Sequence, residues 1–447
     1  MANTYLTRSL ASTNTSWTFS AWVKRERFDL TNYLISWGNS GTDGTGILFA
    51  ASGELAYYSE SSPDNKYRIT SAKYRDVNGW YHVVCKCDSN AITLYVNGEE
   101  PTQSWSVGSS ANPLDTSTMA IGKWVTSNYY HHGSMAHVHF IDGTAYNPST
   151  FGETDSTTGI WKPKTNPSVT YGSNGFFLDF ANSSDMGNDI SGNNNDFTVS
   201  GGTITQTIDT PSNVFATWNA LGPFRLGGGS IRKGTFSNGN TTIAMSSSTY
   251  VETVSATLAV SSGKWYWEVK PTANVNQYGE IGIKSTSANG NNFNGDSGHP
   301  SMIYKYDGTK NYNTIDGTSY GNSYTNNDII GIALDLDNKA IWFSKNGTWQ
   351  NSATQTEIEN GTTTNAAFSG TSSSDGFPST SSTYTPYVIG GDSGGAPTFQ
   401  VNFGNGYFGT TAVASAGTNS GIGTFEYDVP SGYKALCTKN INAEEYS

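Results

Sequence analysis

The sequence predicts an all-β protein built from two antiparallel β-sandwich domains of the jelly-roll-like kind. Short runs of alternating apolar and polar residues recur along the chain and are separated by turn residues, which is the pattern of antiparallel strands. Only 13% of the 447 residues are charged, and Gly, Asn, Ser and Thr are abundant, as in β proteins with many loops. Aromatic residues make up another 13% and can fill two cores. No amphipathic helix or heptad repeat is recognisable, so we expect no coiled-coil stalk in this chain.

The first half of the chain contains a series of segments with strand patterning. Residues 17–24, WTFSAWVK, alternate as a half-buried strand does. Residues 80–85 and 92–96 form a further pair, and the second run ends at an Asn97-Gly98 turn. This spacing indicates an antiparallel sandwich. The remaining predicted strands are residues 34–37, 46–49, 53–58, 119–122 and 133–140.

The second half has its clearest pattern at residues 328–347, DIIGIALDLDNKAIWFSKNG. Two alternating apolar strands flank a tight turn at Asp337-Asn338, and a second turn follows at Asn346-Gly347. The pattern predicts a second sandwich. Its other predicted strands are residues 263–269, 280–283, 385–388 and 399–404.

These motifs resemble two known families. The runs FSAWVK, WYHVV and ITLYVNG, followed by a closing strand, resemble a concanavalin A-like, laminin-G-like lectin sandwich. The strands of the second half resemble a SPRY domain, a β-sandwich that serves as a recognition module. The Asp-x-Ser-Gly-Asn loop that ordinarily precedes the first laminin-G strand is matched here by residues 189–196, after the closing strand. We therefore predict a laminin-G-like domain over 1–200 with residues 171–200 wrapping back onto it, a connector at 201–222, and a SPRY-like domain over 223–447.

The order of the whole chain resembles virion structural proteins of marine and cyanophage-type bacteriophages. The resemblance rests on the first domain, the DTPSN connector at 209–213 and the ending at 425–437. It implies a non-enzymatic tail-fibre or receptor-binding protein that attaches to host cell-surface glycans or proteins. A capsid or tail decoration protein that stabilises the particle is the alternative, and a glycan depolymerase is a third hypothesis. The expected partners are other virion proteins and the host ligand, and a homo-oligomer, with a trimer as the first expectation, suits a fibre.

Charge and hydropathy exclude other functions. The formal net charge is −12 without a Lys/Arg cluster, so we expect no nucleic-acid partner. No apolar run is long enough to cross a bilayer, and the first ten residues lack the apolar core of a signal peptide. We expect no membrane insertion, synthesis in the host cytoplasm and residence in the virion. Cys85, Cys87 and Cys437 are expected to be reduced core thiols.

Catalytic motifs are incomplete. Residues 391–395, GDSGG, match the surroundings of a serine protease nucleophile, but no suitably placed His and Asp accompany them. Asp335 and Asp337 lie two residues apart, whereas a retaining glycosidase needs two carboxyl groups about 5 Å apart in a cleft. We interpret Asp337 as a cap of the hairpin turn. The sequence therefore predicts no catalytic residues.

Two segments could bind a metal. His137 and His139 would share one face of a strand, close to His131 and His132, although neighbouring polar strand residues are more often simply exposed. The loop from Asp185 to Asp196 offers oxygen ligands suited to Ca²⁺, but Asp and Asn also stabilise turns without a metal. No cofactor is required by the proposed role. The candidate Ca²⁺ ligands are Asp185, Asp189 and Asp196.

Aromatic residues in loops and at strand ends are the candidate ligand-binding residues, because a sugar ring stacks on an aromatic face. The alternative is that these rings cover loops or contact another subunit. Residues 350–382, rich in Ser, Thr, Asn and Gly, are either a recognition loop or an insertion without a role. The candidates are Trp105, Trp124, Tyr129 and Tyr130 in the first domain and Tyr304, Tyr306, Tyr312 and Tyr320 in the second.

Overall fold

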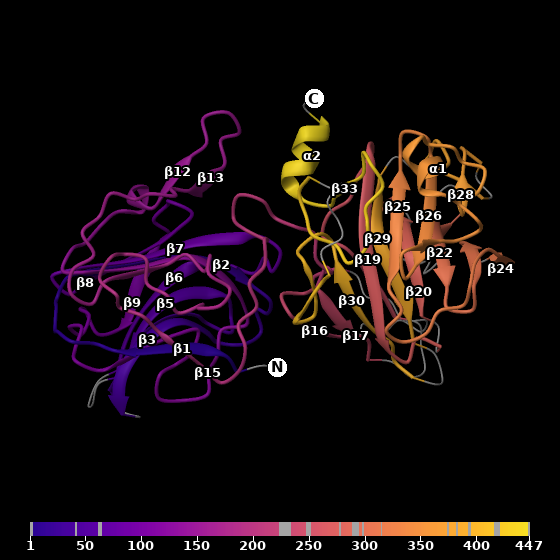
Figure 1. The fold of residues 1–447 in the computed structure, drawn as a ribbon. Helices are drawn as coiled ribbons and strands as arrows, with labels where there is room; N and C mark the ends of the chain where they lie inside the picture. The colour runs from indigo at the N-terminus through magenta and orange to yellow at the C-terminus, as the bar shows by residue number, and fades with distance from the viewer. Residues whose placement is uncertain are drawn as a thin grey trace. The chain divides into compact units, whose positions relative to one another are not determined.

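Strands account for most of the secondary structure, and the chain divides into two units. Unit 1 contains residues 1–206 and 210–212, and unit 2 contains residues 207–209 and 213–447 (Figure 1). The predicted all-β fold of two antiparallel sandwiches is confirmed. The computed structural model describes residues 3–40, 43–60, 65–222, 234–246, 252–276, 279–287, 295–296, 299–313, 315–372, 375–380, 383–391, 395–414 and 421–445.

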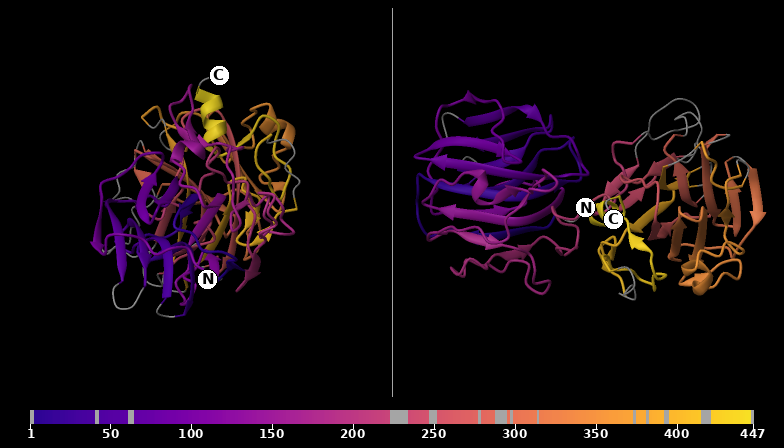
Figure 2. Two further views of the ribbon diagram at one scale, coloured as in Figure 1. Left: turned by 90° about the vertical axis from the view of Figure 1, so that its left-hand side faces the viewer. Right: turned by 90° about the horizontal axis from the view of Figure 1, so that it is seen from above.

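Unit 1 is a sandwich of an eight-stranded and a five-stranded antiparallel sheet, as far as the described residues go (Figure 2). The larger sheet has the order β15-β1-β10-β3-β4-β5-β6-β9, and the smaller has the order β14-β11-β2-β7-β8. A short ribbon, β12-β13, is separate from both. The bounds are β1 Tyr5–Ser9, β2 Trp17–Arg25, β3 Asn32–Ser40, β4 Asp43–Phe49, β5 Glu54–Ser59, β6 Lys66–Lys73, β7 Trp80–Asp88, β8 Ala91–Val96, β9 Gln103–Val107, β10 Thr118–Ile121, β11 Gly133–Asp142, β12 Gly152–Thr154, β13 Trp161–Pro163, β14 Phe176–Leu178 and β15 Thr198–Ser200.

The segment 171–200 supplies one strand to each sheet of unit 1. Strand β14 pairs with β11, where Phe176 lies opposite Phe140, and β15 pairs with β1, where Val199 lies opposite Leu6. Phe176 and the buried Phe197 contact each other edge to face, with ring centroids 4.7 Å apart. Residues 171–200 therefore complete both sheets of the sandwich.

The core of unit 1 lies between its two sheets. Inward residues of alternating strands meet there, and the Trp17 and Trp37 rings pack edge to face at 5.2 Å. Cys85 and Cys87 belong to this core, and both are free thiols, as expected. Burial raises the pKa of both thiols, so they stay protonated and unreactive.

Unit 2 is a second sandwich with sheets of nine and seven strands among the described residues. The larger follows the path β16-β17-β30-β19-β25-β26-β27, with β28 on β26 and β33 on β19, and the smaller follows β18-β29-β20-β22-β23-β24, with β21 on β22. The bounds are β16 Thr235–Ser237, β17 Thr242–Ala244, β18 Glu252–Ser255, β19 Lys264–Ala273, β20 Glu280–Ser285, β21 Gly295–Asp296, β22 His299–Lys305, β23 Thr309–Tyr312, β24 Ile315–Ser319, β25 Ile330–Asp335, β26 Ala340–Lys345, β27 Thr348–Trp349, α1 Gln355–Glu359, β28 Phe368–Ser369, β29 Tyr384–Gly390, β30 Thr398–Asn402, β31 Tyr407–Phe408, β32 Thr411–Ala412, β33 Lys434–Ala435 and α2 Thr438–Glu445.

Unit 2 begins earlier than the predicted boundary at 223. Phe215 and Trp218, placed by the sequence in a connector, are buried in unit 2. Phe215 also bridges to Cys437, which follows β33. The connector is shorter than predicted because these rings pack into the second sandwich rather than lying in solvent.

The segment 350–382 is largely built into unit 2. Helix α1 begins with a capping box between Thr354 and Glu357 and buries Ile358. Phe368 and Phe377 are buried as well. The described residues of this segment therefore contribute to the packing of unit 2, so the segment is not an insertion without a role. In the part of the chain that the structure describes, no helix is both long and apolar enough to span a membrane.

Candidate ligand-binding face

The outer face of the eight-stranded sheet carries the candidate site. Leu6, Met119, Ile35 and Ile47 belong to the core between the sheets, so their neighbours on the same strands point outward. Outward residues that pair directly form one row across all eight strands. The row changes from hydroxyl side chains through small residues to aromatic rings. In order from β15 to β9 it consists of Thr198, Thr7, Ala120, Ser36, Gly46, Tyr58, Tyr67 and Val107.

The loop 122–131 lies over the middle of this row, where the side chains are small. Ser36 fixes the loop, because its Oγ donates to the Lys123 carbonyl and accepts from the Val125 N–H, both at 2.7 Å. The Trp124 indole lies directly over Gly44 and Gly46. A Cβ at Gly44 would come within 2.5 Å of the indole, and one at Gly46 within 3.0 Å. Glycine is required here because the ring occupies the space of a side chain.

On the β3–β6 side of the loop, aromatic rings converge into what we call the aromatic face. The Trp124 ring centroid lies 4.6 Å from that of Tyr33 and 5.6 Å from that of Tyr58. Tyr67 packs edge to face on Tyr58 at 5.9 Å. Tyr129 lies 6.3 Å from Tyr33 and is 57% exposed, so a ligand can reach its ring. The aromatic face consists of Tyr33, Tyr58, Tyr67, Trp124 and Tyr129.

Two phenol groups of this face lie near the Glu60 carboxylate. Tyr58 donates its hydroxyl to Glu60 Oε1 at 3.3 Å. Burial raises the pKa of Tyr33 and of Tyr58, and the nearby Glu60 raises both further, so these two phenols stay neutral at physiological pH. Glu60 Oε2 is buried and has no hydrogen-bond partner among the described residues. An unpaired buried carboxylate oxygen is costly, so Glu60 is an unsatisfied polar group beside these rings.

On the β15–β1–β10 side of the loop lies a hollow of about 470 Å³, which we call the polar pocket. The Arg8 guanidinium forms part of its wall, donating to the Asn174 carbonyl at 3.0 Å and to Asn195 Oδ1 at 2.6 Å. Tyr5 and Tyr130 border the same side, with ring centroids 6.1 Å apart, and Lys123 Nζ lies 4.3 Å from the Tyr5 ring centroid. The pocket is lined by Thr7, Arg8, Ser9, Thr118, Asn194, Asn195, Asp196 and Thr198.

The predicted Ca²⁺ ligands do not form a metal site. Asp189 accepts four hydrogen bonds of 2.8 Å, from the N–H groups of Phe177, Ser191 and Asn195 and from the Ser191 hydroxyl. Asp196 Oδ1 accepts from the Asp189 N–H at 2.8 Å, and Asp185 is exposed. Asp189 therefore organises the loop itself, as turn aspartates do. Among the described residues, no group of three His, Cys, Asp or Glu side chains is placed to hold a metal ion.

The predicted aromatic residues of unit 1 have different environments. Tyr129 is exposed and Tyr130 is half-buried, whereas Trp124 is only 3% exposed and supports the other rings from below. Trp105 is half-buried, packs edge to face on Tyr57 at 6.1 Å and lies away from the aromatic face, on β9. The structure thus brings together Trp124, Tyr129 and Tyr130 but not Trp105.

The prediction for the tyrosines of unit 2 was wrong. Tyr304, Tyr312 and Tyr320 are 0%, 4% and 6% exposed, and Tyr306 packs against the same core. Tyr304 contacts Tyr320 edge to face at 5.5 Å. The Gly- and Asn-rich turns around them resemble an exposed binding surface, but the rings themselves point between the sheets of unit 2. These side chains stabilise the sandwich and are not available to a ligand.

Sequence reasoning missed Tyr33 on β3, Tyr58 on β5 and Tyr67 on β6. It also missed Glu60, which directly follows β5. A signal was present at residues 54–60, ELAYYSE. Leu55 and Tyr57 point into the core, so Tyr58 and Glu60 occupy outward positions of the same strand and its end. A large aromatic residue at an outward strand position indicates a covered or ligand-binding surface.

The carboxylate of Asp335, one of the pair considered for catalysis, is engaged in structural contacts. Asp335 is fully buried, accepts from the N–H groups of Asp337 and Asn338, and pairs with Lys264 at 3.3 Å. Asp335 rather than Asp337 therefore caps the hairpin turn, which corrects the prediction. Ser393 of the GDSGG motif lies outside the described residues.

A Ser–His pair in unit 1 cannot act as a nucleophile and base. His82 Nε2 lies 2.9 Å from Ser20 Oγ, and its Nδ1 accepts from the Trp161 indole N–H at 3.0 Å. The indole donor leaves the ring proton on Nε2, so His82 donates to Ser20 and cannot remove its proton. Burial lowers the pKa of His82 to about 3.

His137 and His139 pack against aromatic rings. His139 stacks on Phe177 with centroids 3.9 Å apart and lies 3.0 Å from the Tyr171 hydroxyl. His137 also stacks on Phe177, at 6.1 Å, so the two rings share one face as predicted. His139 is buried, which overturns the expectation of an exposed strand residue.

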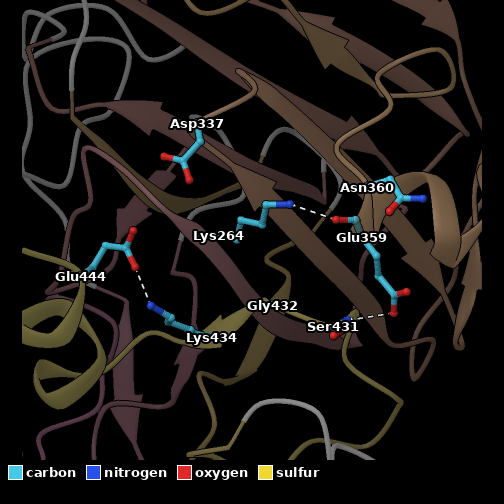
Figure 3. A pocket seen from close by; sticks show the side chains of 8 residues that line it. All are labelled: Lys264, Asp337, Glu359, Asn360, Ser431, Gly432, Lys434 and Glu444. Carbon is cyan, nitrogen blue, oxygen red and sulfur yellow. Dashed lines mark hydrogen bonds and ion pairs between the residues drawn. The ribbon is translucent and has the colours of Figure 1, made fainter. Parts of the chain in front are cut away.

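Unit 2 has a polar hollow of about 480 Å³ (Figure 3). Its polar groups contact one another: Lys264 donates to the Glu359 backbone carbonyl at 3.0 Å, and Lys434 pairs with Glu444 at 2.5 Å. Glu359 Oε1 in turn accepts from the Ser431 N–H at 2.9 Å. These contacts join β19 and residue 431 to the end of α1, and β33 to α2. The lining residues are Lys264, Asp337, Glu359, Asn360, Ser431, Gly432, Lys434 and Glu444.

The two units are β-sandwiches, and each contains a segment that matches a known domain family. Residues 2–149 match the family described as the concanavalin A-like lectin/glucanases superfamily, and residues 264–376 match the SPRY domain family. The chain thus contains a concanavalin A-like domain and a SPRY domain, as the sequence motifs predicted. No curated protein sequence matches the chain.

Among solved structures, the chain is similar to the SPRY domain of human HERC1, with 18% identity over 36% of this chain and 86% of that chain, at a TM-score of 0.27. A heptameric SAP-like pentraxin from Limulus polyphemus matches with 18% identity over 45% of this chain and 88% of its own, at 0.30. The CBM40 of the Ruminococcus gnavus IT-sialidase, bound to sialyllactose, matches with 16% identity over 27% and 72%, at 0.24.

Proposed function

We propose that this chain is a non-enzymatic recognition protein that binds glycans on the aromatic face of unit 1. The observation that carries the proposal is the convergence of Tyr33, Tyr58, Tyr67 and the exposed Tyr129 around Trp124, with Glu60 beside Tyr58. A sugar presents C–H groups to an aromatic ring and hydroxyl groups to polar side chains. The buried Trp124 fixes the rings in place before a ligand arrives, which lowers the entropic cost of binding.

The absence of catalysis is part of the proposal. Asp335 has both carboxylate oxygens occupied, and His82 has its two ring nitrogens occupied by Ser20 and Trp161. On the aromatic face Glu60 Oε1 accepts from the Tyr58 hydroxyl, whereas glycoside hydrolysis requires a pair of carboxyl groups in a cleft. We expect bound oligosaccharides to remain intact, as judged by chromatography after overnight incubation.

We further propose that the protein belongs to a bacteriophage particle, as a tail-fibre or receptor-binding protein that attaches to host surface glycans or proteins. The support is the resemblance of the whole chain to virion structural proteins. In a homo-oligomer, with a trimer as our proposal, several weak sites act together through avidity. No bound metal is required in this proposal, because the loop at Asp189 is held by protein donors.

The alternative is a decoration protein that stabilises the capsid or tail. The observation in its favour is that an aromatic face on a flat sheet suits a protein partner as well as a sugar. The two functions differ in the state of the aromatic face on the particle. The face is exposed in a receptor-binding protein, whereas another virion protein covers it in a decoration protein.

Binding to intact cells of the strain on which the phage grows tests the proposal. The wild-type protein should bind saturably and compete with phage adsorption, and Tyr129→Ala should weaken binding by about tenfold, since an aromatic contact of this kind contributes roughly 0.5–1.5 kcal/mol beyond its buried area. Absence of binding by folded protein, together with protection of Tyr129 on the intact particle, would instead establish decoration.

A further inference from the structure

We propose that the polar pocket and the aromatic face are two subsites for one ligand, a neutral oligosaccharide that crosses the loop 122–131. This inference rests on the proposed function, because it names the class and length of the glycan that the same face takes. The observation that carries it is the row of outward side chains that links the two subsites.

The tip of the loop presents one tyrosine to each side. Tyr129 lies 6.3 Å from Tyr33 on β3, on the side of the aromatic face. Tyr130 lies 6.1 Å from Tyr5 on β1, on the side of the polar pocket. Tyr5 and Thr7 are two residues apart on β1 and point to the same face. A sugar chain that leaves the pocket therefore meets an aromatic ring before and after the tip of the loop.

The separation of the subsites sets the ligand length. From Thr7 on β1 to Tyr58 on β5 there are four inter-strand steps. At about 4.8 Å for each step the two subsites lie roughly 19 Å apart. One monosaccharide cannot touch both, whereas a chain of several linked sugar rings can.

The polar pocket is suited to an uncharged ligand. Its lining includes the hydroxyl groups of Thr7, Ser9, Thr118 and Thr198, each of which can both donate to and accept from a sugar hydroxyl. Positive charge comes from Arg8, which donates to Asn174 and Asn195 and lies near two carboxylates, and from Lys123, which lies against the Tyr5 and Tyr130 rings. The Asp196 carboxylate in the pocket and Glu60 on the aromatic face both repel an anionic sugar.

The experiment uses the full chain and a printed array of neutral and acidic oligosaccharides of one to eight residues, followed by calorimetric titration with the glycans that bind. Ser9→Arg and Thr198→Arg place long side chains in the pocket from exposed positions, so the fold is expected to persist. Thr102→Arg is the matched control. Thr102 is exposed and directly precedes β9, which lies at the opposite edge of the same sheet from β15. Tyr129→Ala removes the exposed ring of the aromatic face.

We expect neutral chains to bind with an affinity that rises at least tenfold from short to long members. The pocket-filling variants should lose that gain and keep the affinity for short members, while Tyr129→Ala should weaken both. Pocket-filling variants that behave like Thr102→Arg, with Tyr129→Ala still weakened, would overturn the two-subsite ligand alone. Preference for acidic chains would overturn the proposal that the ligand is uncharged. Absence of any bound glycan would overturn the proposed function itself.

Discussion

The contact between Trp124 and Gly44 allows a quantitative test of the aromatic face. A Cβ at Gly44 would lie 2.5 Å from Trp124 Cζ2 and 2.8 Å from Cη2, closer than atoms can approach. The backbone of Gly44 is not in the left-handed region, so alanine itself is compatible with the strand. Gly44→Ala should therefore cost about 1–3 kcal/mol through overpacking against the indole.

The double mutant isolates this contact. Trp124→Ala alone should cost about 3–5 kcal/mol, because it removes a buried indole. In that background the clash is absent, so Gly44→Ala should cost nothing or stabilise by up to about 1 kcal/mol through the loss of glycine flexibility. The coupling energy of the cycle is then about 1–3 kcal/mol in favour of the double mutant.

Gly46→Ala is the matched control for the cycle. A Cβ at Gly46 would meet the Ile35 carbonyl oxygen and Trp124 Cζ3, both at 3.0 Å. Removing the indole relieves only part of this crowding, so Gly46→Ala should remain destabilising in the Trp124→Ala background. Scanning calorimetry measures these stability changes in wild type, Gly44→Ala, Trp124→Ala and the double mutant, and in Gly46→Ala with and without Trp124→Ala. Each kcal/mol shifts the melting temperature by roughly 2–4 °C for a domain of this size. An equal cost of Gly44→Ala in both backgrounds would refute the placement of the indole over β4.

Three further predictions concern buried polar groups. Burial lowers the pKa of His82 to about 3, so the unfolded state binds the proton first below pH 6.5 and unit 1 loses stability as the pH falls. Urea unfolding at pH 7 and pH 5 should show a loss roughly 2 kcal/mol larger for wild type than for His82→Gln, and equal losses would contradict the buried neutral ring. Burial raises the pKa of Glu268 to about 7, so its contribution is greatest below pH 4.5 and is lost as the pH rises through 7. The stability difference between wild type and Glu268→Gln should change by roughly 3 kcal/mol between pH 4.5 and 8, and a constant difference would show that its four donors keep it ionised. Asp189→Ala should lower the stability of unit 1 by about 1–3 kcal/mol by orphaning N–H donors, while EDTA leaves the wild-type melting temperature unchanged; a fall with EDTA would restore the calcium hypothesis.

Period-two alternation made the sandwich architecture predictable, because it reports which side of a strand meets the core. Trp265 lies in the core of unit 2, as its alternating run indicates, whereas β2 is buried at every position although residues 17–24 alternate as a half-buried strand does. The match of residues 189–196 to a loop normally found before the first strand led to the wrapped segment that forms β14 and β15. Local patterns were sufficient for these features.

The candidate site was only partly predictable, because it depends on contacts between residues distant in sequence. Trp124 is buried only because Gly44 and Gly46, about eighty residues earlier, leave room for it. Tyr304 and Tyr320 occur among turn residues that suggest a surface, yet neighbouring strands cover them. The donors that satisfy Asp189 include the backbone of Phe177, which no local motif reveals.

The wrapped segment determines where unit 1 can be cut. A fragment ending at residue 149, where the concanavalin A-like match ends, would lack Phe176, Leu178 and Phe197 of the core. It would also leave β1 and β11 as open edges, which favour aggregation through pairing with other chains. A fragment extended to residue 206 retains both edge strands and the polar pocket. For fusion to a carrier protein, the segment to transfer is therefore residues 1–206.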